Sequence, residues 1–178
     1  MTPFARIVAL SIAAAALAAA APSFAALKVG DKAPDFTVSA ATDGTVSTFA
    51  LQDVLKNGPV VVYFYPKAFT GGCSMEAHAF SEAMPEFSAK HVSVIGLSTD
   101  DVPTLQSFSQ KDCAGKFPVG SDATAAVATA YDAKMSAANM ANRISYVVGT
   151  DGLITFVHDD GDAATHVPAL LAAVGADK

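Results

Sequence analysis

The chain has 178 residues and a formal net charge of −6, with 11 lysines and arginines against 17 acidic residues. This length suits one domain that can bury a substantial core. An acidic chain without a Lys/Arg cluster argues against nucleic acid or an anionic membrane as a partner.

The first 25 residues are predicted to be a secretory signal. Arg6 supplies a basic start, residues 7–21 form an Ala-rich apolar stretch, and residues 23–25 carry the small-x-small pattern of a cleavage site. A membrane anchor is the alternative, but the stretch is shorter than the ~20 residues that a spanning helix needs. The same stretch raises the hydrophobic fraction to 52% without indicating a membrane protein. We therefore expect cleavage after Ala25 and a soluble mature chain in the bacterial periplasm or secreted.

Residues 26–178 are predicted to form a single α/β domain. The turn signal Asp43-Gly44 separates strands at residues 36–40 and 46–49 into a hairpin. The unbroken apolar run at residues 60–65 is typical of a strand that is covered on both faces. The further elements expected in chain order are a helix at 51–55, a helix at 72–90 with a kink at Pro85, a strand at 92–97, a helix at 102–113, a strand at 117–119, a helix at 123–131, a hairpin of strands at 144–148 and 153–157, and a helix at 164–174. This alternation of strands and helices indicates an α/β sandwich.

The residues that follow the strand at 60–65 are the most informative about function. They place Cys73 at the start of a helix, where free N–H groups and the positive end of the helix dipole favour a thiolate. Thr70, three residues earlier, is expected to cap this helix and to hydrogen-bond at the sulfur. Pro66 removes a backbone donor and is expected to shield one side of the pocket. Cys73 is therefore the first candidate for a redox thiol, and a structural disulfide with Cys113 is the alternative.

The string P-x-x-x-T-x-x-C that opens this helix resembles the active-site signature of the peroxiredoxins. Residues 63–73 are most similar to the bacterioferritin-comigratory (PrxQ) branch, and residues 29–36, 95–100 and 143–146 are similar to other segments of the family. The resemblance covers nearly all of the chain after about residue 27. It implies a thioredoxin-like fold, in which helices flank a central mixed β-sheet with an N-terminal β-hairpin. It also implies thiol-dependent reduction of hydrogen peroxide or small organic hydroperoxides.

The resemblance further implies roles for particular residues. Cys73 would attack the O–O bond and become a sulfenic acid, while Thr70 and Arg143 position the peroxide and the thiolate. Arg143 is the sole arginine once Arg6 leaves with the signal, and a solvated strand-end charge or an ion pair is the alternative for it. Glu76 matches a common family glutamate. It is expected to orient Arg143 or to favour the helix start through the dipole.

The residue that resolves the sulfenic acid is less clearly indicated. Many members of the PrxQ branch carry a resolving cysteine five residues after the first, but this chain has His78 there. Other members resolve from the helix after the next strand, and Cys113 lies near the end of the helix predicted at 102–113. A disulfide needs Cα atoms within ~7 Å, so a Cys73–Cys113 bond is expected to require local unfolding around both residues. A buried free thiol at Cys113, with an external thiol as resolver, stays open.

Two further functions are alternatives to the peroxidase. Cys73 and His78 could bind copper in a thioredoxin-fold redox protein, although an offset of five points their side chains in poorly matched directions. General disulfide exchange is disfavoured because Cys73 is not part of a C-x-x-C motif. His91, His158 and His166 are expected at the surface. The peroxidase interpretation requires no metal, flavin or haem. It implies a thioredoxin-like dithiol donor and a monomer, as is frequent in the PrxQ branch.

Overall fold

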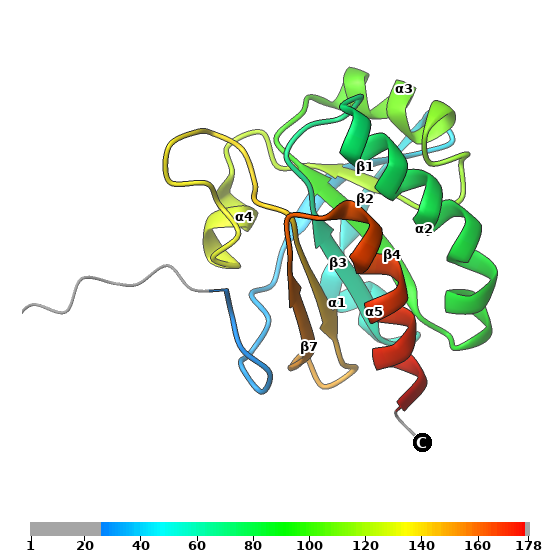
Figure 1. The fold of residues 1–178 in the computed structure, drawn as a ribbon, viewed down its shortest axis with the longest axis vertical. Coiled ribbons are helices and arrows are strands. Elements are labelled where there is room, and N and C mark those ends of the chain that lie inside the picture. Colours follow the sequence, from blue (N-terminus) through cyan, green and yellow to red (C-terminus); the bar gives the residue numbers. More distant parts are fainter. Residues whose placement is uncertain (1–25, 177–178) are drawn as a thin grey trace, which may run out of the picture.

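A computed structural model describes residues 26–176, and the signal predicted over residues 1–25 lies outside them. In chain order the elements are β1 (Thr37–Thr42), β2 (Thr45–Ala50), α1 (Leu51–Leu55), β3 (Val60–Phe64), α2 (Gly71–Ala89), β4 (Ser93–Ser98), α3 (Val102–Lys111), β5 (Val119–Ser121), α4 (Ala126–Ala130), β6 (Ile144–Val148), β7 (Ile154–Asp159) and α5 (Ala163–Ala176) (Figure 1). The strands form one sheet in the order β2-β1-β5-β4-β3-β6-β7. Because β3 is parallel to β4 and antiparallel to β6, the sheet is mixed, as predicted.

Strand β3 lies inside the sheet and is buried at every position. Its alternate residues divide between two hydrophobic clusters: Val60, Val62 and Phe64 belong to one, and Val61 and Tyr63 to the other. Since successive side chains of a strand point to opposite faces, a strand covered on both faces needs apolar residues throughout. The prediction drawn from the apolar run is therefore confirmed.

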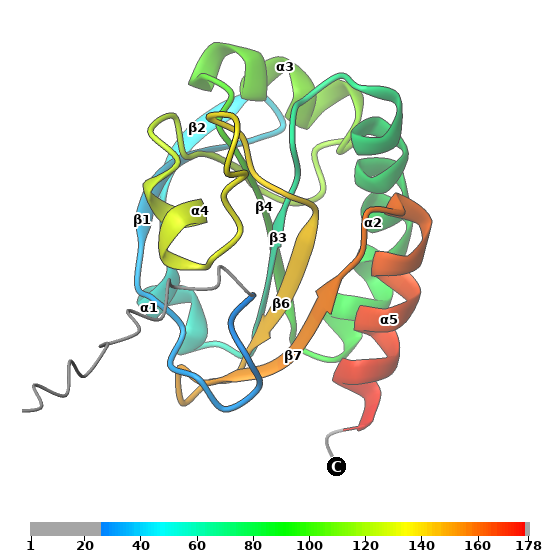
Figure 2. The same cartoon turned by 60° about the vertical axis from the view of Figure 1, so that its left-hand side comes forward.

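Helices cover the two faces of the sheet unequally. Residues of α1 and α4 contribute to the first cluster, and residues of α2, α3 and α5 contribute to the second. Figure 2 shows α2 and α5 side by side on one side of the sheet, and these two helices make direct contact. None of the helices within residues 26–176 is long and apolar enough to cross a membrane.

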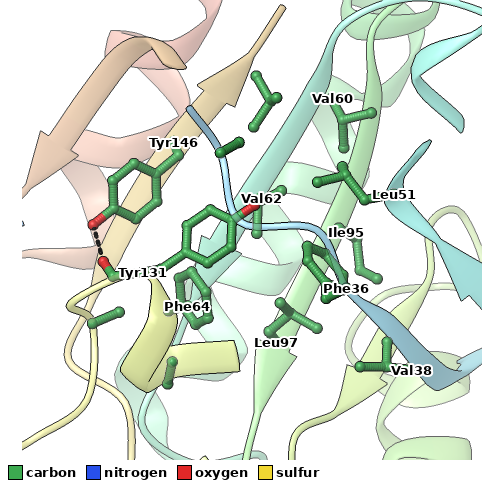
Figure 3. Close-up of a cluster of buried hydrophobic side chains, with 14 of the residues drawn as sticks. Phe36, Val38, Leu51, Val60, Val62, Phe64, Ile95, Leu97, Tyr131 and Tyr146 are labelled. Carbon is green, nitrogen blue, oxygen red and sulfur yellow. Dashed lines mark hydrogen bonds between the residues drawn. The ribbon is translucent and has the colours of Figure 1, made fainter. Parts of the chain in front are cut away.

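The first cluster holds β6 in place through aromatic side chains (Figure 3). The ring of Tyr131 lies 5.4 Å from those of Phe64 and Tyr146. The Tyr146 hydroxyl donates to the Tyr131 carbonyl at 2.7 Å, and the Tyr131 hydroxyl donates to the Pro34 carbonyl at 2.8 Å. Both buried hydroxyls are thus satisfied. These contacts anchor the strand that follows Arg143.

The N-terminal hairpin confirms its turn signal. Asp43 and Gly44 both have positive φ, at 49° and 72°, as a two-residue turn between paired strands requires. Pairing continues to Thr42 and Thr45 at the turn, so β1 ends two residues later and β2 begins one residue earlier than predicted. At its other end β1 begins one residue later than predicted, and β2 ends one residue later.

Several helices and strands between residues 71 and 130 differ from their predicted form or bounds. Helix α3 ends at Lys111, because Ala114 and Gly115 take left-handed conformations that turn the chain away. Cys113 therefore lies beyond the helix in which it was predicted. Strand β5 begins two residues later than predicted, and α4 has only five residues. Helix α2 continues through Pro85 as a single helix of 19 residues.

Candidate active site

Cys73 is the third residue of α2 and its side chain is only 2% exposed. The loop that delivers it from β3 is held by the buried carboxylate of Asp100, just beyond β4. This carboxylate accepts hydrogen bonds from the Ala68 N–H at 2.7 Å and from the Ser98 hydroxyl at 2.9 Å, and Lys67 Nζ lies 3.3 Å from it. Because β3 and β4 are parallel, their carboxyl ends meet at one edge of the sheet. Asp100 therefore holds in place the loop that leads from β3 to Cys73.

Thr70 and Pro66 lie in this loop. Thr70 is the N-cap residue of α2 by position, with φ −92° and ψ 148°. The predicted cap by its side chain is wrong, because the hydroxyl donates instead to the Lys67 carbonyl at 2.9 Å and closes the turn before the helix. Pro66 is half-buried at the beginning of the loop. The Thr70 hydroxyl is thus bound to the backbone and makes no hydrogen bond to the sulfur.

Arg143 immediately precedes β6 and reaches across the start of α2. Its Nη2 lies 3.4 Å from Cys73 Sγ, its Nη1 donates to Glu76 Oε2, and its Nε donates to the Gly161 carbonyl at 3.2 Å. The side chain is 9% exposed. A Cβ at Gly72 would lie 3.3 Å from Nη2, so the bare backbone there leaves room for the guanidinium. Arg143 is therefore held at three points, with one nitrogen directed at the sulfur.

Glu76 is fully buried behind Arg143. Burial raises the pKa of Glu76 to about 8, although the charge and hydrogen bond of Arg143 act in the opposite direction. Partial burial opposes the charge of Arg143, but Glu76 and Cys73 together raise the Arg143 pKa above its usual value. The second carboxyl oxygen, Glu76 Oε1, has no hydrogen-bond partner among residues 26–176. The contact that an orienting role for Glu76 requires is thus present.

His166 was predicted at the surface, but it is fully buried on α5. Its Nδ1 lies 2.7 Å from Ser145 Oγ and 3.8 Å from Glu76 Oε1, and its Nε2 lies 2.8 Å from the Asp160 carbonyl. Burial lowers the pKa of His166. No motif marks this histidine. The available signal is its helical spacing with the buried Leu170.

The other two histidines in this group differ from each other. His91 is exposed, in agreement with the prediction. His158, also predicted at the surface, is half-buried: its ring lies 4.6 Å from that of His166, and its Nε2 lies 2.8 Å from Thr165 Oγ1. The contact with α5 accounts for the difference.

Cys113 is fully buried in the turn after α3, and both cysteines are free thiols. Burial, with the neighbouring charge of Asp112, raises the pKa of the Cys113 thiol. The turn is tied to α2, because the Ser81 hydroxyl donates to the Cys113 carbonyl and Lys116 Nζ donates to the Ser81 carbonyl at 3.2 Å. Cys113 is therefore enclosed in this conformation, and its surroundings favour the thiol over the thiolate.

His78 is exposed on α2 and faces the Cys113 turn, with its Nε2 3.8 Å from Asp112 Oδ1. Within the described part of the chain, no group of three or more His, Cys, Asp or Glu side chains is arranged to hold a metal ion. The copper alternative gains no support from this arrangement.

Comparison with known proteins agrees with the geometry. The AhpC/TSA family profile matches residues 29–157. Peroxiredoxin Bcp of Escherichia coli is 32% identical over 151 residues, which cover 82% of this chain and 94% of that protein. Peroxidoxin BcpB of Mycobacterium tuberculosis has a similar structure, with a TM-score of 0.78, 30% identity, and coverage of 85% of this chain and 99% of that one.

A further solved structure was determined in a study of alkyl peroxide reduction by the bacterioferritin comigratory protein of Xanthomonas campestris. It matches with a TM-score of 0.70 and 26% identity, covering 79% of this chain and 90% of that one. These similarities confirm the thioredoxin-like fold and do not favour the copper or disulfide-exchange alternatives. The chain therefore belongs to the AhpC/TSA family and is a thiol-dependent peroxidase of its Bcp (PrxQ) peroxiredoxin branch.

Proposed function

We propose that Cys73 is the peroxidatic cysteine and that Arg143 activates it. The observation that carries this assignment is the 3.4 Å contact between Arg143 Nη2 and Cys73 Sγ at the start of α2. A guanidinium and a helix N-terminus both favour a negative charge on the sulfur. Cys73 is almost fully buried, which suits a small peroxide as the substrate.

The reaction begins with attack of the Cys73 thiolate on one oxygen of the peroxide. A sulfur–oxygen bond forms, the O–O bond breaks, and the other oxygen leaves as water or an alcohol after taking up a proton. The sulfur loses two electrons and becomes a sulfenic acid, while the peroxide gains them. Arg143 stabilises the negative charge as it moves from the sulfur to the departing oxygen.

The other residues of the site support this step. Glu76 orients the guanidinium through its hydrogen bond to Nη1. Pro66 shields the sulfenic acid on the loop side. The hydroxyl of Thr70 contacts the peroxide once it turns away from the Lys67 carbonyl, at the cost of one backbone contact.

Cys113 is our candidate for the resolving cysteine. Its sulfur would attack the Cys73 sulfenic acid, form a disulfide and release water, and a dithiol would then reduce the disulfide by exchange. The burial of Cys113 and its ties to Ser81 and Lys116 require that the turn after α3 opens first. Resolution by an external thiol is the competing route.

One experiment tests both parts. The reduced mature protein is treated with one equivalent of hydrogen peroxide and its peptides are mapped by non-reducing mass spectrometry, with Cys73→Ser and Cys113→Ser as controls. A Cys73–Cys113 disulfide supports the two-cysteine cycle. Sulfenic acid on Cys73 with free Cys113 keeps the nucleophile but removes Cys113 as resolver. An unreactive Cys73 contradicts the assignment.

We further propose a periplasmic, monomeric enzyme that receives electrons from a thioredoxin-like dithiol protein. The basic start, apolar stretch and small-residue site in residues 1–25 support export, after which a single domain begins at Ala26. The intact mass of protein from a periplasmic extract tests cleavage after Ala25, and a mass retaining the signal contradicts it. Light scattering of the reduced protein tests the monomer.

A further inference from the structure

A row of buried polar groups continues from Arg143 into the protein, behind the proposed nucleophile. Glu76, Ser145 and His166 are all fully buried. Glu76 uses one carboxyl oxygen for Arg143, and the other has no hydrogen-bond partner in the described part of the chain. That oxygen lies 3.8 Å from His166 Nδ1. A buried oxygen without a hydrogen-bond donor lowers the stability of the fold. The short distance between this oxygen and His166 therefore points to a role for the pair.

The hydrogen bonds of His166 assign its tautomer. The carbonyl of Asp160, 2.8 Å from Nε2, can only accept, so Nε2 carries the hydrogen. In the neutral ring, Nδ1 then accepts from the Ser145 hydroxyl at 2.7 Å. If His166 gains a proton, Nδ1 becomes a donor that faces Ser145 and Glu76. The ring is thus fixed on one side and changes its hydrogen bonding on the side facing the active site.

We propose that His166 is a positioning residue for the peroxidase reaction. With Ser145 it sets how the Glu76 carboxyl meets Arg143, and through Arg143 how the guanidinium meets the Cys73 sulfur. This inference rests on the proposed function, because it takes Cys73 as the nucleophile and Arg143 as its partner.

The charged groups around His166 link its contact with Glu76 to the pH dependence of the site. Titratable and charged groups face it from each neighbouring element: Glu76 on α2, Arg143 before β6, His158 on β7 and Asp160 before α5. Burial disfavours charge on both His166 and Glu76, lowering the pKa of the first and raising that of the second. A neutral Glu76 leaves the full charge of Arg143 for the sulfur, whereas an ionised Glu76 compensates part of it. The pH dependence of Cys73 reactivity is therefore expected to depend on His166.

Three substitutions separate the two sides of the ring. His166→Asn keeps an amide near the position of Nδ1, His166→Gln keeps one near Nε2, and His166→Leu removes both. His91→Asn is the matched control, because His91 is exposed and its φ of 58° is a conformation that asparagine tolerates. Two rates are measured on each reduced variant across pH: alkylation of Cys73 by iodoacetamide, followed on the Cys73 peptide, and oxidation by hydrogen peroxide.

We expect His166→Leu and His166→Gln to lower the rate constant with hydrogen peroxide about 10-fold, less than the loss of a group that touches the reacting atoms. The pH profile of Cys73 alkylation should shift in these two variants. His166→Asn should recover most of the rate and the profile, and His91→Asn should match the wild type.

Wild-type rates and profiles in His166→Leu and His166→Gln would overturn the proposal. An equal loss in all three His166 variants without a change of pH profile would also overturn it, because that indicates only structural damage. If the His166 variants fail to fold, Ser145→Ala decides from the other end of the hydrogen bond: a shifted profile supports the proposal and an unchanged one rejects it. If Cys73 of the wild type does not react with peroxide, the proposed function is contradicted. The pH profile of Cys73 alkylation would still test the role of His166 in that case.

Discussion

Replacing Arg143 with methionine measures what the guanidinium contributes at the Cys73 sulfur. Methionine has an unbranched apolar side chain, so the change removes the charge and the donors while filling much of the space. Nη2 lies 3.4 Å from the sulfur and the Arg143 side chain is 9% exposed, so water screens the contact only partly. The matched control is Arg143→Lys, which keeps the charge but cannot serve the sulfur and Glu76 with one planar fork.

The expected size of the effect follows from this distance. Two unit charges 3.4 Å apart attract by about 5 kcal/mol at an effective dielectric constant of about 20. This figure is an upper bound, because Glu76 in its ionised form compensates part of the guanidinium charge. Removing one stabilising donor from an active site costs about 100- to 1,000-fold in rate. We expect this loss for Arg143→Met in the second-order rate constant with hydrogen peroxide, and about 10-fold for Arg143→Lys.

The assay is a single-turnover reaction of fully reduced protein with hydrogen peroxide in a stopped-flow instrument, read as loss of the Cys73 thiol. Arg143→Met leaves the buried Glu76 carboxyl without its cation, but burial already favours the protonated form, so the fold should persist. The double variant Arg143→Met/Glu76→Gln checks this, because it removes both charges. A rate constant for Arg143→Met close to that of the wild type would refute the assigned role.

Three further predictions concern stability. The folded-state pKa of Glu76, about 8, exceeds its ordinary value of 4.5, so its contribution to stability is present below pH 4.5 and is lost as the pH rises through about 8. In urea unfolding, the free energy of unfolding of Glu76→Gln should therefore increase relative to that of the wild type from about pH 5 to about pH 9. A difference between the two proteins that stays constant with pH would contradict this. A methyl group at Gly96 would lie 2.5 Å from the buried ring of Tyr63, so Gly96→Ala should cost about 1–3 kcal/mol. Adding Tyr63→Leu should cost less than the sum of the two single changes, and strict additivity would argue against the clash. The buried carboxylate of Asp122 accepts two backbone N–H groups of α4, at 3.1 Å and 2.7 Å, so Asp122→Ala should lower the unfolding free energy by about 2 kcal/mol while Asp122→Asn keeps part of it. An unchanged urea midpoint in Asp122→Ala would show that α4 does not need this cap.

Features that depend on neighbouring residues were predictable. The apolar run at residues 60–65 indicated a strand buried on both faces, and Asp43-Gly44 indicated the hairpin turn, because each signal acts within a few residues. The string from Pro66 to Cys73 likewise placed a cysteine at a helix start. Boundaries were less certain where a short turn decides them. The left-handed Ala114 and Gly115 end α3 before Cys113, and an alanine in that conformation carries no sequence signal.

The amino-acid sequence by itself determined the strand–loop–helix unit that presents Cys73 and, through its motifs, the family of the chain. Only the tertiary structure decided which side chains meet. Arg143 and Glu76 are 67 residues apart along the chain, yet Arg143 donates a hydrogen bond to Glu76 beside the Cys73 sulfur. Helix α5 brings His166 against Glu76, and the Thr70 hydroxyl turns to a loop carbonyl. The burial of a side chain and the identity of its hydrogen-bond partner depend on how distant segments pack against one another. The free energy of burying and pairing these polar groups is therefore set by the whole folded chain and not by neighbouring residues.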